Sequence, residues 1–175
     1  MRTAEPEDAP VFGELYSQRQ PRSFLLDMRR EIQMPTVDEI REVLGRKDAR
    51  QGASMMHVIE DKTGVIRGFT SLRPAPPEIS YAELTFAMID EAHYTSPMAE
   101  EAFNYQLRLS FVERKLRKMI AQCLGNEQGY RDMLLRLGFE SCGVQRDVIF
   151  AGGAYHGLET FSLFNPEFRG DSHAD

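Results

Sequence analysis

Alternating apolar and polar residues predict three strands in the first half of the chain. The runs 55–60 and 65–72 are rich in apolar and β-branched residues. They flank Asp61-Lys62-Thr63-Gly64, which is typical of a tight turn, so the two runs are expected to form an antiparallel hairpin. A third strand is expected at 81–89, where apolar residues stand at every second position. The prolines of segment 73–78 cannot donate to a sheet ladder, so this segment is expected to lie outside the strands.

Apolar residues spaced three and four apart predict four helices. The first lies within 5–16, where Asp8 is placed to cap its start. The second begins at the capping box Thr36-Val37-Asp38-Glu39. A long helix of about five turns carries its apolar residues from 98 to 116. A fourth helix follows and is closed by Gly138 at its C-terminal end.

Further strands complete the pattern in the second half. An apolar run at 119–124 follows the long helix, which implies a parallel strand–helix–strand crossover. Two last strands, near 144–151 and 159–164, are expected to be joined by the glycine-rich loop 152–157. Segment 18–35 fits a helix fragment or a long ordered loop equally well. With an optional first strand, the order (β)ααβββαβαββ predicts an α/β or α+β domain with a mixed sheet and four helices.

Length and composition limit the class of protein. The 175 residues suit a single domain, expected to cover 1–166 and to be followed by a tail at 167–175. With 27 acidic and 21 basic side chains, the net charge of −6 argues against binding to nucleic acid or to an anionic membrane. No run reaches the roughly 18 apolar residues of a membrane span, and the N-terminus lacks an apolar signal core, so a cytoplasmic location is expected.

The residues that often bind metals or form disulfides are sparse. The chain has two cysteines, Cys123 and Cys142, which are too few for a disulfide framework or a zinc knuckle. His57 has no partner at metal-ligand spacing, so no metal site is expected.

Two segments carry a resemblance to a known family. They are AELTFAMIDEAHYTSPMAEEAF at 82–103 and NEQGYRDMLLRLGF at 126–139, in the expected order along the chain. With the order of elements, they resemble the GNAT superfamily of acyl-CoA-dependent N-acetyltransferases, and 152–164 is similar to the last hairpin of its ribosomal-protein N-terminal acetyltransferase branch. The resemblance implies a mostly antiparallel GNAT sheet. It also implies transfer of an acetyl group from acetyl-CoA to a primary amine of a small molecule or peptide, by direct attack.

The pyrophosphate loop departs from the family's pattern, which reads Gln/Arg-x-x-Gly-x-Gly/Ala. Anchored on Glu101-Ala102, the three defined positions are Tyr94, Pro97 and Ala99, of which only Ala99 fits. The resemblance therefore implies a degenerate loop that would meet the cofactor through Tyr94, Thr95, Ser96, Met98, Ala99 and Glu100. The alternative is purely structural, with Ser96 as the N-cap of the long helix and Pro97 as its first residue.

The resemblance also implies that the strands near 81–89 and 119–124 splay apart around the pantetheine arm of the cofactor. The expected edge for that arm is Leu84, Phe86 and Met88. Further cofactor contacts are expected from Asn126 and Arg131. The spacing from Asn126 to Gly138 is one residue longer than in the family, and Asn126 could instead be a plain N-cap.

Two residues are candidates for catalysis. Glu83 is a carboxylate in an otherwise apolar strand and would be the general base, although the alternation of the strand could place it on an exposed face. Leu134 stands where many members have the tyrosine that protonates the leaving thiolate. Tyr130, one turn earlier on the same helix face, could replace that tyrosine or could be a core aromatic residue.

The altered loop and Leu134 also support an alternative function. A GNAT-fold protein that has lost catalysis would act as an acyl-CoA-binding or regulatory module. A homodimer through the C-terminal hairpin is compatible with either function. In an active enzyme, the amine is expected to dock against the region 22–31 and the loop 73–78.

Overall fold

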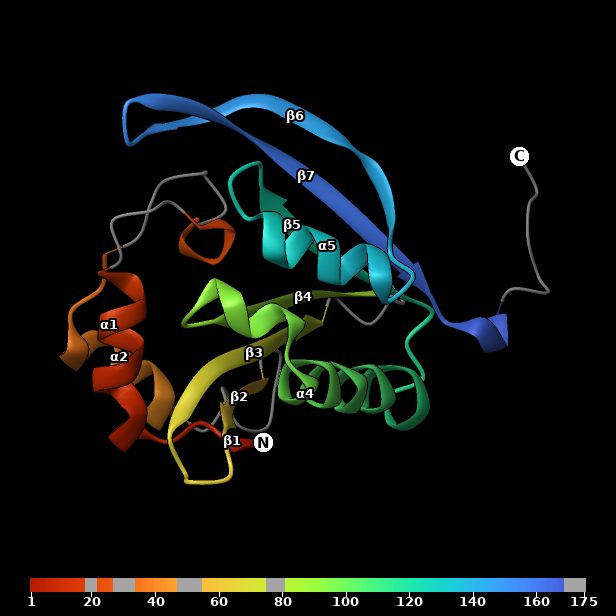
Figure 1. Ribbon diagram of the computed structural model, residues 1–175. Helices are drawn as coiled ribbons and strands as arrows, with labels where there is room; N and C mark the ends of the chain where they lie inside the picture. The colour runs from red at the N-terminus through yellow and green to blue at the C-terminus, as the bar shows by residue number, and fades with distance from the viewer. Residues whose placement is uncertain (18–21, 27–33, 47–54, 75–80, 169–175) are drawn as a thin grey trace.

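The computed structural model describes residues 1–17, 22–26, 34–46, 55–74 and 81–168, which form one seven-stranded sheet with helices on both faces (Figure 1). The strand order is β1-β2-β3-β4-β5-β7-β6. β4 and β5 run parallel, and every other neighbouring pair is antiparallel. The strands are β1 (Arg2–Thr3), β2 (Met55–Glu60), β3 (Ile66–Pro74), β4 (Tyr81–Met88), β5 (Lys118–Leu124), β6 (Glu140–Ala151) and β7 (Ala154–Phe164). This confirms the predicted fold class.

The predicted hairpin is present as β2 and β3. Its turn is closed by the Gly64 N–H, which donates to the Asp61 carbonyl at 3.0 Å, and Gly64 has a positive φ of 83°. One boundary was wrong, because Arg73 and Pro74 belong to β3, where Pro74 pairs with Ala82. A proline is tolerated there because it is the last residue of β3. Residues 75–78 of the expected loop lie outside the described residues.

The first two helices are α1 (Ala9–Tyr16) and α2 (Val37–Gly45). The capping box of α2 is confirmed, since the Glu39 N–H donates to Thr36 Oγ1 and the Thr36 N–H donates to Glu39 Oε2. Asp8 precedes α1 but its side chain does not cap that helix. Its carboxylate instead accepts from Arg2 and from the Glu5 N–H, closing the short 3-10 turn η1 (Pro6–Asp8). Of segment 18–35, the described part contains the 3-10 turn η2 (Ser23–Leu25), and 18–21 and 27–33 lie outside the described residues.

The long helix is shorter than expected. α4 (Pro97–Arg108) passes into one π-helical turn, η4 (Leu109–Glu113), and Leu116 follows the helix. The extra residue in the π turn shifts the face that points inward. Tyr105 and Val112, expected in the core, are exposed, whereas Gln106 and Phe111 are buried.

The last helix ends where the sequence predicts, whereas the last hairpin has a shorter turn than expected. α5 (Gln128–Arg136) is followed by Gly138, whose φ of +87° suits the predicted C-terminal cap. The expected glycine-rich loop is mostly strand, because only Gly152 and Gly153 form the turn and the rest belongs to β7. Both glycines have positive φ, as a two-residue hairpin turn requires. The short 3-10 turn η5 (Pro166–Phe168) begins where the tail was expected, and 169–175 lie outside the described residues.

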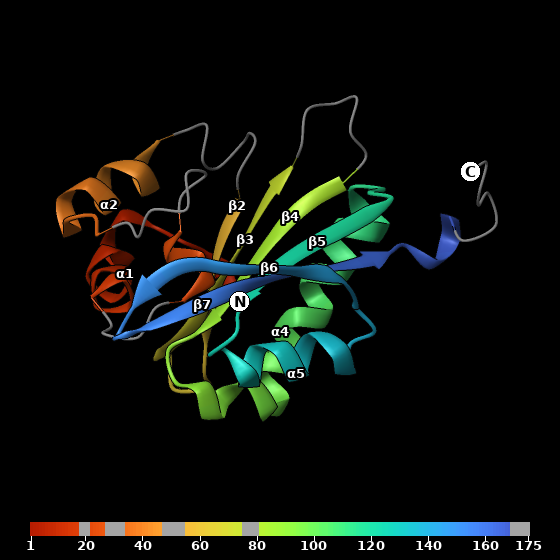
Figure 2. The ribbon, with the colours of Figure 1, turned by 90° about the horizontal axis from the view of Figure 1, so that it is seen from above.

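Two apolar clusters hold the helices to the sheet from opposite sides (Figure 2). On one face, α1 and α2 pack against Val58, Phe69 and Ala87. On the other face, α4 and α5 pack against alternate residues of β4, namely Ala82, Leu84, Phe86 and Met88. The odd-numbered residues of β4 therefore point to the side of α1 and α2, and the even-numbered ones to the side of α4 and α5.

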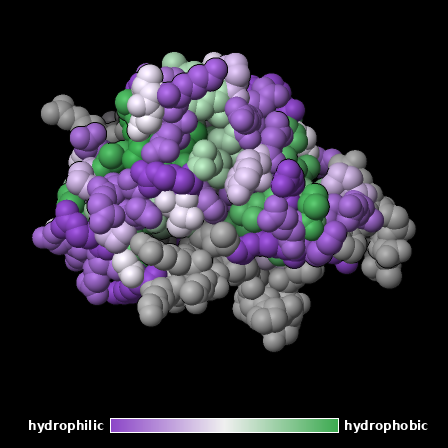
Figure 3. Space-filling model, turned by 90° about the horizontal axis from the view of Figure 1, so that it is seen from below, coloured by the Kyte–Doolittle hydropathy of each residue, from purple (hydrophilic) through white to green (hydrophobic). Residues whose placement is uncertain are grey.

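On the face shown in Figure 3, hydrophilic residues predominate and hydrophobic ones lie in small separate groups. Within the described part of the chain, no helix has both the length and the apolar character needed to cross a membrane.

Candidate active site

The only parallel strand pair among the described residues opens into a gap. β4 and β5 pair from Tyr81 and Lys118 to Leu84 and Ala121, and the pairing stops there although both strands continue. Past these residues the main chain of β4 is no longer matched by β5. The strands therefore diverge on their C-terminal side, as the sequence predicted.

A cavity of about 260 Å³ lies at this divergence. Its walls come from η2, from the end of β3, from β4 and β5, and from α5. The lining residues are Ser23, Phe24, Leu26, Arg73, Glu83, Leu84, Thr85, Phe86, Gln122 and Tyr130. Both candidate catalytic residues thus line one cavity, although they come from different elements.

Glu83 stands at the rim of the cavity rather than in a closed interior. Its side chain is 40% exposed, and Oε2 lies 3.8 Å from Arg73 Nη1 on the neighbouring strand. Glu83 and Arg73 are directly opposite each other in the β3–β4 register. The expected burial of Glu83 is therefore not seen, but its position at the cavity is.

Tyr130 projects from the first turn of α5 towards the gap. Its ring is buried and stacks on Tyr94, with ring centroids 5.5 Å apart. Its hydroxyl is buried without a hydrogen bond of normal geometry among the described residues, and the main chain of Phe86 approaches it. Burial raises the pKa of Tyr130 well above its ordinary value, so the hydroxyl keeps its proton at neutral pH. Tyr130 is thus both a core aromatic residue and a wall of the cavity.

The main-chain groups of β4 that face the gap belong to alternate residues. Leu84 is paired with β5, as described above. Met88 is satisfied by side chains, because its N–H donates to the Tyr94 hydroxyl at 3.2 Å and its carbonyl accepts from Arg22 Nη1 at 2.7 Å. By the period of two along a strand, Phe86 faces the gap between them, beside Tyr130.

A buried network crosses the wide end of the gap. Arg22 Nη2 also donates to the Tyr94 hydroxyl, and its Nε lies 3.4 Å from Glu127 Oε1. Glu127 Oε2 accepts from the N–H groups of Ser23 and Leu124 at 2.9 and 2.8 Å. Both members of the ion pair are almost completely buried. The network therefore ties the N-terminal segment and β4 to the turn between β5 and α5.

Sequence reasoning missed Glu127 and gave Arg22 only a place in the docking region. One signal for Glu127 was present, since it lies at the family's spacing from Gly138, one residue closer than Asn126. Glu127 is also the residue at the N-cap position of α5. Arg131, expected at the cofactor, donates from Nε to Glu159 Oε2 at 2.8 Å.

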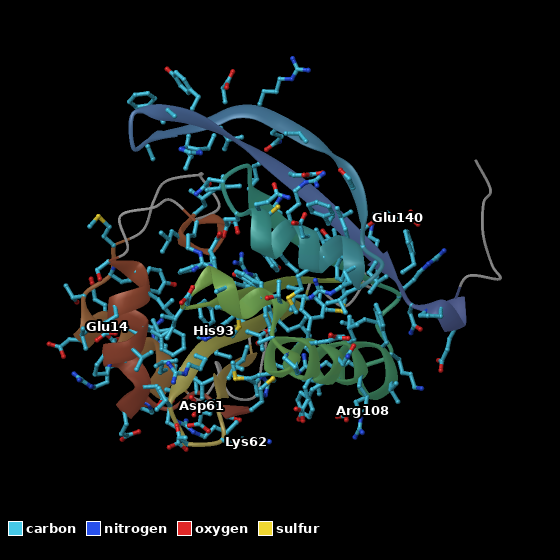
Figure 4. All side chains as sticks on the ribbon, in the orientation of Figure 1. Glu14, Asp61, Lys62, His93, Arg108 and Glu140 are labelled. Atoms are coloured by element: carbon cyan, nitrogen blue, oxygen red, sulfur yellow. The ribbon has the colours of Figure 1, made fainter. Side chains whose placement is uncertain are left out.

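The start of α4 is capped by its own chain. Ser96 Oγ accepts from the Ala99 N–H at 3.2 Å and donates to the carbonyl of His93, which lies in the 3-10 turn η3 (Glu91–Thr95) between β4 and α4 (Figure 4). The Glu100 N–H donates to the Ser96 carbonyl. Pro97 has no N–H. In the first helical turn, residues 97–100, the Met98 N–H is therefore the one main-chain donor that makes no hydrogen bond to another described residue.

Other residues considered from the sequence lie away from this chemistry. Cys123 is buried, and burial, as the main cause, raises the pKa of its thiol to about 12. It is therefore a thiol at neutral pH, which does not suit a nucleophile. No group of three or more metal-binding side chains occurs among the described residues.

Comparison with known proteins agrees with this geometry. Residues 1–140 match the family described as acetyltransferase (GNAT) domain. A search of curated protein sequences found no match. Among solved structures, spermidine N-acetyltransferase from Vibrio cholerae in complex with CoA and spermine is 20% identical, with 94% of each chain covered and a TM-score of 0.76.

Two further solved structures have the same fold. The dodecameric intermediate state of the Vibrio cholerae spermidine N-acetyltransferase is 20% identical, with 98% of this chain and 96% of that chain covered and a TM-score of 0.74. A probable acetyltransferase is 22% identical over 95% and 93% of the two chains, with a TM-score of 0.73. Because the family match covers most of the sequence and the strands diverge where this fold holds its acyl donor, the chain belongs to the GNAT acetyltransferase family.

Proposed function

We propose that this protein transfers the acetyl group of acetyl-CoA to a primary amine inside the cavity between β4 and β5, with Glu83 as general base and Tyr130 as general acid. The observation that carries the proposal is the cavity itself. It joins a rim carboxylate, a buried hydroxyl and the exposed end of a parallel strand pair in one place.

The acyl end of the cofactor fits the residues present. The thioester and the pantetheine arm would lie along the gap-facing edge of β4, formed by Leu84, Phe86 and Met88. Since both main-chain groups of Met88 already have side-chain partners, Phe86 is the best-placed residue to bind the acetyl group. The cofactor supplies an activated acetyl group when it is bound.

The proposed chemistry moves one proton from nitrogen to sulfur. Glu83 accepts a proton from the attacking amine, directly or through one water molecule, while the new N–C bond forms. Tyr130 donates its hydroxyl proton to sulfur as the C–S bond breaks. Exchange with water through the cavity restores both side chains, so the products are the N-acetylated amine and CoA.

The diphosphate end fits less well. The Ala99 and Glu100 N–H groups have partners within the chain, and Pro97 has none to offer. We propose that Met98 provides the main-chain donor. The hydroxyls of Thr95 and Ser96 already donate to the carbonyls of Ala92 and His93, so they fit a phosphate only if these bonds are exchanged. Tyr94 is fully buried, so its role is to shape the end of the gap from inside. Asn126 and Arg131, near the start of α5, remain candidates for the nucleotide end.

The finer placement within the family is also a proposal. The similarity of the last hairpin to the ribosomal-protein N-terminal acetyltransferase branch remains a prediction. The solved neighbours include enzymes that act on spermidine, so an amine acceptor is the common expectation.

Cofactor binding and turnover test the proposal separately. At 100 times its dissociation constant, acetyl-CoA should stabilise the fold by about 2.7 kcal/mol, which a thermal-shift assay detects. Glu83→Gln and Tyr130→Phe should each lower kcat by roughly 10²-fold or more and keep the thermal shift. The matched controls Glu101→Gln and Tyr105→Phe change exposed residues of α4 and should keep full activity. Wild-type turnover by both catalytic variants would contradict the assigned roles.

One structural feature favours a second candidate function. The Arg22–Glu127 network fills the wide end of the gap with side chains, as would suit a GNAT fold that no longer turns over. Such a protein would act as an acyl-CoA-binding module or as a regulatory or interaction module. A thermal shift with acetyl-CoA but no turnover would favour the acyl-CoA-binding module, and no shift at millimolar acetyl-CoA would favour the regulatory or interaction module.

A homodimer through the C-terminal hairpin remains part of the proposal. β6 is an edge strand whose residues are exposed along most of its length. Near the turn, Phe150 and Tyr155 contact each other but are 63% and 67% exposed. An exposed edge with apolar side chains is suited to pairing with a second copy.

A further inference from the structure

Among the residues that the structure describes, the cavity is lined by one side chain of each charge. Arg73 and Glu83 face each other across β3 and β4, and their nearest nitrogen and oxygen atoms are 3.8 Å apart. That separation is longer than a hydrogen bond, and the two side chains are 57% and 40% exposed. An ion pair this loose and this exposed is weak, so a ligand can replace it at little cost.

The rest of the described lining adds no charge. Ser23, Thr85 and Gln122 are polar and neutral, and the remaining residues are apolar or aromatic. The charged part of the described lining is therefore one guanidinium and one carboxylate. A polycation would gain one attraction at Glu83 and meet one repulsion at Arg73.

We propose that the acceptor is a free α-amino acid, whose carboxylate binds Arg73 and whose amine binds Glu83. The inference rests on the transferase function proposed above, and it names the class of acceptor. Guanidinium groups bind carboxylates through paired hydrogen bonds, and the short distance between Arg73 and Glu83 matches an amine and a carboxylate attached to one carbon.

This arrangement places the reacting nitrogen at the base. Glu83 accepts the proton that the amine loses as its nitrogen forms the bond to the acetyl carbon. The carboxylate of the amino acid stays ionised and bound to Arg73 throughout, and it takes no part in bond formation. The products are an N-acetyl amino acid and CoA.

The substrate test compares each amino acid with its carboxamide, which keeps the amine but lacks the carboxylate. The twenty common L-amino acids, their carboxamides and spermidine are assayed singly with acetyl-CoA, and released CoA thiol is measured. At least one amino acid should be acetylated, with a kcat/KM about tenfold to hundredfold above that of its carboxamide. It should also be preferred to spermidine.

A variant then assigns the effect to Arg73. Arg73→Gln should lower kcat/KM for the amino acid by about tenfold to hundredfold more than it lowers kcat/KM for the carboxamide, which has no carboxylate to lose. The matched control is Arg67→Gln, because Arg67 lies on the same strand but pairs with Asp61 at the far end, near the turn labelled in Figure 4. Arg67→Gln should leave kcat/KM unchanged for every acceptor.

Three outcomes would overturn the inference. Spermidine could be preferred to every amino acid, or Arg73→Gln could lower kcat/KM for the amino acid and for its carboxamide by the same factor. In these two cases the transferase function stands and the acceptor class is wrong. If acetyl-CoA gives no thermal shift, the transferase function fails and the acceptor class fails with it.

Discussion

Single buried polar residues set the width of the gap between β4 and β5. Arg22 reaches across its wide end from Met88 on β4 to Glu127 beside β5. Both charged groups lie in the interior, where they are held by each other and by hydrogen bonds, from Arg22 to Met88 and Tyr94 and from two main-chain N–H groups to Glu127. These contacts connect residues far apart in the chain, such as 22 and 127, so no local pattern in the sequence could reveal them.

Removing one member of this pair should be costly. We expect Glu127→Ala to lower the free energy of unfolding by about 3–5 kcal/mol, because it removes the buried carboxylate that lies beside Arg22 and accepts from the Ser23 and Leu124 N–H groups. Chemical denaturation measures the change. The control Asp38→Ala breaks the exposed Arg41–Asp38 pair on α2 and should cost less than about 1 kcal/mol. Equal effects of the two substitutions would show that the Glu127 pair is not buried in solution.

His57 should make stability depend on pH. Burial, followed by the positive charges of Arg114 and the N-terminus, lowers the pKa of His57 below its ordinary value of 6.5. The unfolded chain therefore takes up a proton more readily than the folded one, so stability is full above pH 6.5 and falls as the pH drops below it. Between pH 7.5 and 5.5, the midpoint temperature of thermal unfolding should fall less for His57→Gln than for the wild type. The same fall in both proteins would contradict this role of His57.

Elements with a strong local signal could be predicted from the sequence. The capping box at Thr36, the turn at Gly64 and the cap at Gly138 each fix a boundary by chemistry within a few residues. The long helix was extended too far because its π turn depends on packing and leaves the apolar spacing in the sequence unchanged. Likewise, 154–157 form strand through pairing with β6, which overrides their glycine-rich composition.

The part of the candidate site that lies on β4 could be anticipated from the sequence. The resemblance implied that Leu84 and Phe86 border the gap and named Glu83 as the base, and all three residues line the cavity, although their roles stay predictions. That Arg73 lies opposite Glu83 was not predicted. Predicting it needs the register of β3 against β4 and the extension of β3 to Pro74. The partners of Tyr94 could not be foreseen either, since the family pattern assigns that position to the phosphate loop.

At the scale of the whole molecule, the hairpin of β6 and β7 forms one edge of the sheet and is the surface that we propose for self-association (Figure 1). We expect a dimer of about 40 kDa, twice the chain mass of 20.0 kDa, by light scattering coupled to size-exclusion chromatography. Phe150→Glu should shift the protein to a monomer because it places a charge in the apolar contact. Tyr105→Glu, on α4, should leave the dimer intact. A wild-type monomer at micromolar concentrations would contradict the proposal.

The stacked pair Tyr94 and Tyr130 gives the protein a built-in optical signal. The sequence has no tryptophan, so its ultraviolet emission comes from six tyrosines. Tyr130 lines the cavity with its ring against Tyr94, and a molecule entering there changes the surroundings of both rings. Occupancy of the gap can therefore be followed by intrinsic fluorescence in the unlabelled chain, and comparison with Tyr130→Phe identifies the part of the signal that arises at the gap.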